Sequence, residues 1–129
     1  MRHRSKKVLK IRGLVQKSDL VIRTLMTNLL KHGHLTTTEK KAKVLVAHAD
    51  SFLAKLVAFH NDLDEANAKR ETFRLVKSRI FGNEEGKKVV REILPALLTT
   101  KKKSGFLSLV KLGKRIGDGA EQVRVEIIK

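Results

Sequence analysis

Basic residues are concentrated in two blocks of the 129-residue chain that contain almost no acid. Residues 1–34 carry nine Lys or Arg and one acidic residue, and residues 86–115 carry the same numbers, so each block has a net charge of +8. Residues 35–85 have a net charge of only +1. Because charges of one sign repel each other, such a chain is destabilised as a compact fold until a polyanion neutralises the blocks. A surface that only had to be soluble would mix the two signs.

The rest of the composition is that of a small folded protein. A hydrophobic share of 41% supports a modest core, and the length suits one domain. We therefore expect a single domain over residues 1–129, with a basic N-terminal arm over 1–17 and a globular body over 18–129. The chain has no cysteine, which excludes disulfides and thiolate metal sites. No apolar run approaches the roughly 20 residues of a membrane span, and no apolar stretch of a signal peptide follows the basic start.

Hydrophobic periodicity predicts helices through most of the body. Apolar residues recur at helical spacing between Leu20 and Leu30, which predicts a helix over about 18–32 that ends at Gly33. The Thr run at 36–38 favours a short strand. A second helix, capped by Thr36, Thr37 or Thr38, is expected to end near residue 62. A third helix and a fourth that begins near Glu84 follow, and Pro95 is expected to disrupt the fourth.

The C-terminal part alternates as strands do. Residues 106–112 predict a strand that is apolar on both faces, and therefore a candidate for the centre of the sheet. Residues 123–127 predict a half-buried strand. The Gly117-Asp118-Gly119 step favours a loop between them in which Asp118 forms the turn rather than contacts a base. The order helix, strand, three helices, two strands predicts an α+β domain, with helices packed on a three-stranded sheet.

Nucleic acid is the commonest polyanionic partner of such a chain, and three groups of cations are candidates to bind it. Lys and Arg neutralise phosphates, and double-stranded RNA is recognised mainly through its shape, its phosphates and its 2′-hydroxyls. The arm contributes Arg2, His3, Arg4, Lys6, Lys7, Lys10, Arg12 and Lys17. Lys31, His32, Lys40, Lys41 and Lys43 flank the Thr strand. A second patch contains Lys101, Lys102, Lys103, Lys111, Lys114 and Arg115.

Aromatic, histidine and acidic residues do not indicate another chemistry. Phe52, Phe59, Phe73, Phe81 and Phe106 fall in predicted helices and a predicted strand, so they are expected in the core. With no Tyr or Trp, there is little platform on which single-stranded bases could stack. The five His residues lack metal-ligand spacing, and no carboxylate pair points to a metal-dependent nuclease. We expect no metal, no cofactor, no small-molecule substrate and no enzymatic activity.

Three stretches of the chain carry a family pattern. They are the opening MRHR, the stretch LLKHGHLTTTEKKAK from Leu29 to Lys43, and SGFLSLVKLGKRIGDGAEQVRVEI from Ser104 to Ile127. In this order they resemble the bacterial large-subunit ribosomal protein seventeen family. The chain departs from that pattern in its Lys-rich rather than Arg-rich arm and in Ser104-Gly105-Phe106, where the family has Gly-Gly-Tyr. Residues 59–85 have no match that we could assign residue by residue.

The resemblance implies both a fold and a function. The fold would be a layer of helices on one face of a small mixed sheet. The function would be that of a structural constituent of the large ribosomal subunit, in the bacterial cytoplasm, which supports subunit assembly and translation. Its partners would be large-subunit ribosomal RNA, near the polypeptide exit side, and neighbouring ribosomal proteins, with no membrane involved.

Two other functions would also suit a small basic chain. A nucleoid DNA-binding protein would carry a helix-turn-helix pair or form a symmetric dimer with basic arms, and the Thr strand after the first helix argues against the former. An RNA-processing enzyme would need a convergent carboxylate pair. Co-sedimentation with large subunits rather than nucleoids separates the first two functions. The RNA-processing enzyme would be supported if the purified protein cleaved RNA and if substitution of one carboxylate residue abolished that activity.

Overall fold

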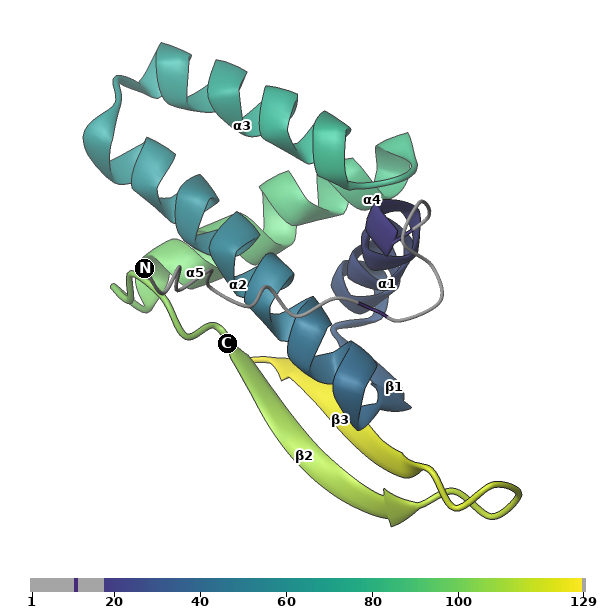
Figure 1. The fold of residues 1–129 in the computed structure, drawn as a ribbon. Helices are drawn as coiled ribbons and strands as arrows, with labels where there is room; N and C mark the ends of the chain where they lie inside the picture. The colour runs from purple at the N-terminus through teal and green to yellow at the C-terminus, as the bar shows by residue number, and fades with distance from the viewer. Residues whose placement is uncertain (1–10, 12–17, 129) are drawn as a thin grey trace, which may run out of the picture.

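The computed structural model describes residue 11 and residues 18–128 of the chain. Figure 1 shows the order of the elements in this part. They are α1 (Ser18–His32), β1 (His34–Thr38), α2 (Glu39–Asp62), α3 (Glu65–Arg79), α4 (Asn83–Lys88), the π-helical turn η1 (Val89–Ile93), α5 (Leu94–Thr99), β2 (Leu107–Lys114) and β3 (Glu121–Ile127). Because α4, η1 and α5 form one continuous helical stretch, the predicted order of helix, strand, three helices and two strands is confirmed.

Helix α1 begins and ends where the sequence predicts. Asp19 lies in its first turn, and Lys31 and His32 lie in its last, so both ends carry the charge that the helix dipole favours. Gly33 follows with a φ of 79°, in the left-handed region that closes many helices. Its N–H donates a hydrogen bond of 2.7 Å to the carbonyl of Leu29. The chain can then turn directly into β1.

Helix α2 starts without a side-chain cap. Its N-cap residue is Thr38, in an extended conformation, and no side-chain hydrogen bond caps the helix there. The capping box that the spacing of Thr36 and Glu39 allows is therefore not formed. The Glu39 carboxylate pairs instead with Lys43, one turn along α2. Thr38 was one of the three residues that the sequence left open as the cap.

The sheet has β3 at its centre and is antiparallel throughout. The strand order is β1-β3-β2, and both pairings are antiparallel. The sequence favoured the more apolar β2 for the centre and a mixed sheet, and the structure differs on both points. A short loop pairs β2 with β3, so β1 takes the only remaining edge of β3. Leu109, Val110 and Leu112 of β2 are about half exposed, so their apolar character does not reflect burial.

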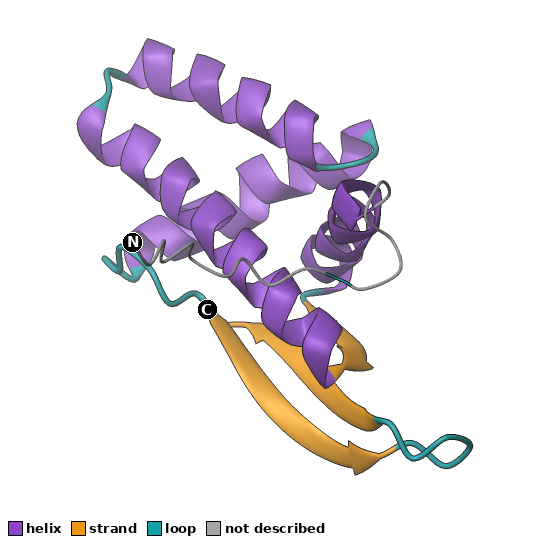
Figure 2. Cartoon of the chain, in the orientation of Figure 1, coloured by secondary structure: helices purple, strands orange, loops and turns teal. Residues whose placement is uncertain are grey.

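The helices lie together on one side of the sheet (Figure 2), which confirms the α+β class. Alternation along β3 directs Val123 and Val125 into the core, where both are buried. Arg124 and Glu126 belong to the opposite set of positions and form an ion pair with 2.6 Å between Nε and Oε1. Helix α3 runs back beside α2, on the far side from the sheet.

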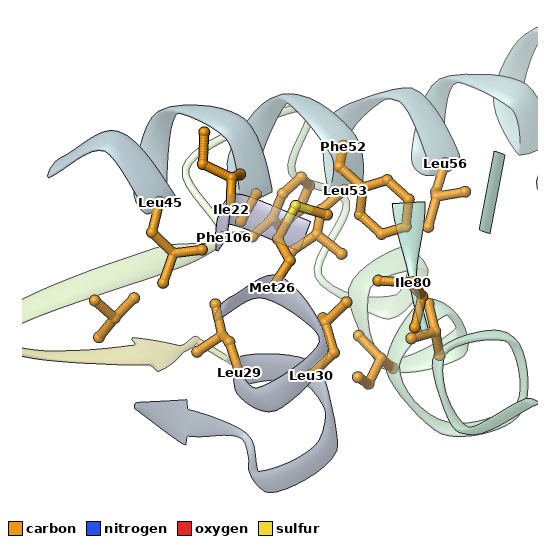
Figure 3. Packing of buried hydrophobic residues seen from close by; sticks show 14 of the residues in the cluster. Ile22, Met26, Leu29, Leu30, Leu45, Phe52, Leu53, Leu56, Ile80 and Phe106 are labelled. Atoms are coloured by element: carbon orange, nitrogen blue, oxygen red, sulfur yellow. The ribbon is translucent and has the colours of Figure 1, made fainter. Parts of the chain in front are cut away.

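One hydrophobic core joins the helices to the sheet. In Figure 3, Leu45 and Leu53 of α2 point toward α1, Phe52 and Leu56 lie over Ile80, and Phe106 lies in the same cluster. Leu53 is fully buried, and burying a side chain of that size contributes about 1.5–3 kcal/mol to stability. Ile11, the one described residue before α1, also belongs to this cluster and is 6% exposed.

The expectation that all five phenylalanines lie in the core is wrong. Phe52 and Phe106 are buried, but Phe59 and Phe81 are only partly buried, and Phe73 is 52% exposed. Helix α3 is the most polar of the longer helices, and its buried residues are Ala68, Thr72 and Val76. Phe73 follows Thr72, about 100° further round the helix, and so points away from the covered face.

Pro95 disrupts the regular α-helix of the fourth predicted helix, as expected, but does not end the helical stretch. The N–H of Leu94 donates to the carbonyl of Val89, five residues back, so the helix widens into the π turn η1 just before the proline. In a regular α-helix the proline ring would clash with the carbonyl four residues earlier, here that of Arg91. The wide turn relieves that clash, and α5 continues to Thr99.

Candidate nucleic-acid interface

The cations predicted in the N-terminal arm lie outside the described residues. They are Arg2, His3, Arg4, Lys6, Lys7, Lys10, Arg12 and Lys17. Ile11 alone is described in this segment, and it is buried among core residues rather than exposed. Ile11 itself is therefore part of the core of the body.

Six predicted cations lie at the end of the sheet where β2 and β3 are joined. Thr38, the last residue of β1, pairs with Gln122 of β3, and Gly113 of β2 pairs with the same Gln122. The first turn of α2 and the end of β2 therefore lie beside one stretch of β3. We refer to this group as the hairpin-end cluster, and it consists of Lys40, Lys41, Lys43, Lys111, Lys114 and Arg115.

Acidic residues compensate part of the hairpin-end cluster. Lys43 Nζ lies 2.9 Å from Glu39 Oε1, and this hydrogen bond lowers the pKa of Glu39 and raises that of Lys43. The positive charge of Lys111 lowers the pKa of Glu39 further. Lys40, Lys41 and Lys114 are exposed and have no acidic partner within residue 11 and residues 18–128. These three side chains are left for an external anion, as is Lys111, which is exposed and forms no ion pair with a described residue.

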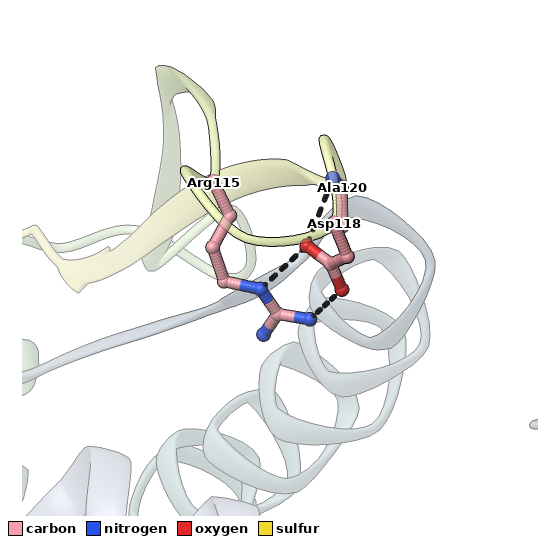
Figure 4. Close-up of polar contacts among 3 residues, drawn as sticks. All are labelled: Arg115, Asp118 and Ala120. Atoms are coloured by element: carbon pink, nitrogen blue, oxygen red, sulfur yellow. Dashed lines mark hydrogen bonds and ion pairs between the residues drawn. The ribbon is translucent and has the colours of Figure 1, made fainter.

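The loop at the tip of the hairpin is held by its own side chains (Figure 4). Asp118 accepts a hydrogen bond of 2.9 Å from Arg115 Nε through Oδ1, and a second one from Arg115 Nη2 through Oδ2. The N–H of Ala120 also donates to Oδ1, at 3.2 Å. The Arg115 guanidinium is the main reason that the pKa of Asp118 lies far below its ordinary range. These bonds confirm that Asp118 forms the turn, and they hold the Arg115 guanidinium in the loop.

The other described cations lie at the opposite end of the sheet. Lys31 and His32 precede Gly33, whose carbonyl accepts a hydrogen bond of 3.1 Å from Ile127 at the end of β3. Residues 101–103 precede β2 at the same end, where Ile128 donates to the carbonyl of Phe106. The eight residues of β2 span about 26 Å. The predicted second patch is therefore spread along β2, with Lys101, Lys102 and Lys103 far from Lys114 and Arg115.

At this end of the sheet, an acidic residue neutralises Lys31 but not the lysines at 101–103. Lys31 Nζ lies 3.2 Å from Glu85 Oε1. The pKa of Glu85 is lowered first by a hydrogen bond from its own backbone N–H and then by Lys31. Lys101, Lys102 and Lys103 are exposed, and the described residues offer them no acidic partner. They form the second concentration of unneutralised charge.

Sequence reasoning missed a basic face on helix α3. Arg70, Arg74 and Lys77 recur at spacings of four and three residues and thus share one side of the helix, where Phe73 also lies. Arg74 pairs with Glu71 at 3.3 Å, but Lys77 has no acidic partner in the part of the chain that the structure describes. The net charge of residues 35–85 is close to zero and therefore did not indicate this basic face of α3. The spacing of the basic residues along the predicted helix would have indicated it.

Other site chemistries find no support in the described part of the chain. No group of three or more His, Asp or Glu side chains there could hold a metal ion. None of the described helices is long and apolar enough to cross a membrane.

Comparison with known proteins decides the family. The family model described as Ribosomal protein L17 matches residues 21–128. The chain belongs to the ribosomal protein L17 family. This confirms the resemblance, although residues 59–85 carried none of the motifs that suggested it. As a member of this family, the chain is a structural component of the large ribosomal subunit in the bacterial cytoplasm, and not an enzyme.

Three curated relatives show how far the similarity extends. The large ribosomal subunit protein bL17 of Rubrobacter xylanophilus is 35% identical over 114 residues, which cover 85% of this chain and 82% of the relative. The bL17 protein of Gemmatimonas aurantiaca is 30% identical over 99% of this chain and 98% of its own length. That of Fervidobacterium nodosum is 30% identical over the full length of both chains. The similarity thus includes the basic N-terminal segment.

Proposed function

We propose that the chain binds large-subunit ribosomal RNA through its basic N-terminal arm and through cations at both ends of its sheet, and so supports subunit assembly and translation. The observation that carries the proposal is the set of exposed lysines that no described acid neutralises. At the ends of the sheet these include Lys40, Lys41 and Lys114 on the hairpin side, and Lys101, Lys102 and Lys103 on the other. Membership of a ribosomal protein family supports ribosomal RNA as the polyanion.

The arrangement suits recognition of folded RNA by its backbone. The two groups of lysines are separated by the length of β2, about 26 Å, so one rigid body can contact phosphates of two RNA segments. Lysine suits this role as a strongly hydrated point charge, and the Arg115 guanidinium fixed in the loop adds a planar donor. We assign the arm cations from Arg2 to Lys17 to the same RNA.

Neighbouring ribosomal proteins are the second class of partner that we propose. The apolar residues Leu109, Val110 and Leu112 lie about half exposed along the edge strand β2, and Ile116 in the hairpin loop is 98% exposed. Because successive strand residues point to opposite faces, Leu109 and Val110 put apolar surface on both sides of this edge strand, and such exposed surface is available for contact with other macromolecules.

Salt dependence of binding tests the RNA proposal. The full chain is titrated with its own large-subunit RNA transcript over a range of KCl concentrations. The logarithm of the binding constant falls linearly with the logarithm of the salt concentration, and each phosphate contact makes the slope steeper by about 0.7–0.9. The triple variant K40Q/K41Q/K114Q should therefore bind with a slope that is shallower by about 2. The matched control is K55Q/K69Q, since Lys55 lies on α2 away from the sheet ends and Lys69 pairs with Glu65 at 2.5 Å. An unchanged slope in the triple variant would remove the hairpin end from the proposal.

The arm and the competing DNA function need separate experiments. Deletion of residues 2–10 leaves Ile11 in place, so the body should still fold while incorporation into large subunits falls. A duplex DNA of equal charge serves as competitor for the RNA transcript. Equal affinity for both nucleic acids, with co-sedimentation in the nucleoid fraction, would favour the DNA-binding function instead.

A further inference from the structure

A hollow of about 420 Å³ lies between α1, the end of α3 and α4. Two aromatic rings line it, those of Phe73 and Phe81, together with Ile80 and the cations Arg23 and Lys77. Phe73 is 52% exposed, which is unusual for the largest apolar side chain on its helix. The hollow therefore combines bare aromatic surface with positive charge, and the proposed function above assigns it no role.

One wall of the hollow is rigidly built. The Arg23 guanidinium carbon lies 4.1 Å from the centroid of the Phe81 ring. Arg23 Nη2 donates to the carbonyls of Lys77 and Ile80, at 3.1 and 3.3 Å, where α3 ends. The Phe81 N–H donates to Thr27 Oγ1 at 3.0 Å. Helix α1 thus fixes both the turn after α3 and the orientation of the ring.

Arg23 keeps one donor unused. Its Nε is buried and has no hydrogen-bond partner among the described residues. A buried N–H without an acceptor is uncommon in folded proteins, so this wall of the hollow is not fully satisfied by the described residues.

The charge around the hollow indicates a polyanion. Lys77 and Lys87 line it with Arg23, and Lys77 has no acidic partner in the part of the chain described. Lys87 is compensated in part, since its Nζ lies 2.7 Å from Glu84 Oε1. Arg70 and Arg74 extend the positive charge along the same face of α3 as Phe73.

We propose that this hollow holds a single unstacked nucleotide of the large-subunit RNA, with its base against the exposed ring of Phe73 and its phosphate on Lys77 and Lys87. Specific recognition of RNA relies on such splayed-out bases, which stack on aromatic rings or guanidinium planes. An apolar side chain of a neighbouring protein would also cover Phe73, but it would leave the positive charge of Lys77 without a partner. The inference rests on the proposed RNA-binding function and adds to it a second, base-contacting site on α3.

The test compares F73L with wild type in binding to the large-subunit RNA transcript. Leucine keeps the apolar bulk at an exposed position and removes the stacking, so affinity should fall about fivefold or more while the thermal unfolding midpoint stays unchanged. K77Q should also weaken binding. The control variants F59L and K55Q alter the same residue types on α2, outside the hollow, and should bind as wild type does.

Irradiation of reconstituted large subunits at 254 nm identifies what occupies the hollow. We expect a nucleotide joined directly to the peptide that contains Phe73. If F73L and K77Q bind like wild type and this peptide carries no nucleotide, the inference is overturned while salt-dependent RNA binding stands. A protein cross-linked to this peptide instead would assign the hollow to a protein neighbour. If the wild-type chain fails to bind the transcript, the proposed function itself falls, and this site with it.

Discussion

The carboxylate of Asp50 on α2 accepts a hydrogen bond of 2.8 Å from the backbone N–H of Phe106, the residue that precedes β2. Its second oxygen accepts from the N–H of Gly105 at 3.2 Å. One side chain thus satisfies two consecutive amides that no strand pairing reaches, and it fixes where β2 begins. The Phe106 ring is then held in the core, where it is 1% exposed.

Replacing Asp50 by alanine should destabilise the fold. Two backbone donors lose their charged acceptor, and one of them is partly buried, so the free energy of unfolding should fall by about 1–3 kcal/mol. Urea denaturation followed by circular dichroism measures this change. Glu92→Gln, an exposed change on the fourth helical stretch, is the control and should stay within about 0.5 kcal/mol of wild type. An equally small effect of D50A would show that the two bonds contribute nothing net.

Gly33 should not tolerate a side chain, for conformational rather than steric reasons. Its φ of 79° is left-handed, yet a Cβ there would meet no atom within 4 Å. Gly33→Ala should therefore cost about 1–2 kcal/mol through backbone strain alone. Gly117→Ala is the matched control, since Gly117 has equally open surroundings and no left-handed φ. Equal thermal unfolding midpoints for the two variants would contradict this reasoning.

The hairpin loop should stay ordered in mild acid. The pKa of Asp118 is lowered in the folded chain, so its stabilising contribution is complete above the ordinary value of about 3.9 and is lost only as the pH falls below it. NMR shifts of the Ala120 amide and the Arg115 Nε–H should hold steady from pH 7 to about 4 and change below that. In Asp118→Asn they should not titrate. A transition near the ordinary value in the wild-type chain would contradict the fixed ion pair.

Ile11 should contribute to stability although it lies within the basic segment. It is 6% exposed, so Ile11→Ala should cost about 2–5 kcal/mol through lost burial and a residual cavity. Leu20→Ala is the control, because Leu20 is 54% exposed. Both can be compared by urea unfolding of the full-length chain. If the two variants unfold at the same urea concentration, Ile11 does not pack into the core in solution.

The helices could be predicted from sequence because their signals are local. Gly33 ends α1 and the Thr run precedes α2, and both depend only on nearby residues. The strand order could not be predicted, since the place of β2 at an edge depends on which strands meet in space. Its apolar residues Leu109, Val110 and Leu112 favour a central position by sequence, yet they are about half exposed at the edge.

The candidate site was predicted in part for a related reason. The spacing of Glu39 and Lys43 in a predicted helix already indicates their ion pair, but the pairing of Lys31 with Glu85, far away in sequence, could not be predicted before the structure showed it. Phe73 illustrates the same limit. Periodicity placed it in a helix, but only the packing of α3 shows that its side of the helix is uncovered.

The π turn changes which side chains of its helical stretch face the core. In an uninterrupted α-helix, five residues rotate by about 500°, so Leu94 would lie about 140° round from Val89. The hydrogen bond from Leu94 to the Val89 carbonyl adds one residue to the turn and brings both side chains to the same face, where both are buried. A chain of regular helical pitch would therefore need one residue fewer here to cover the same core.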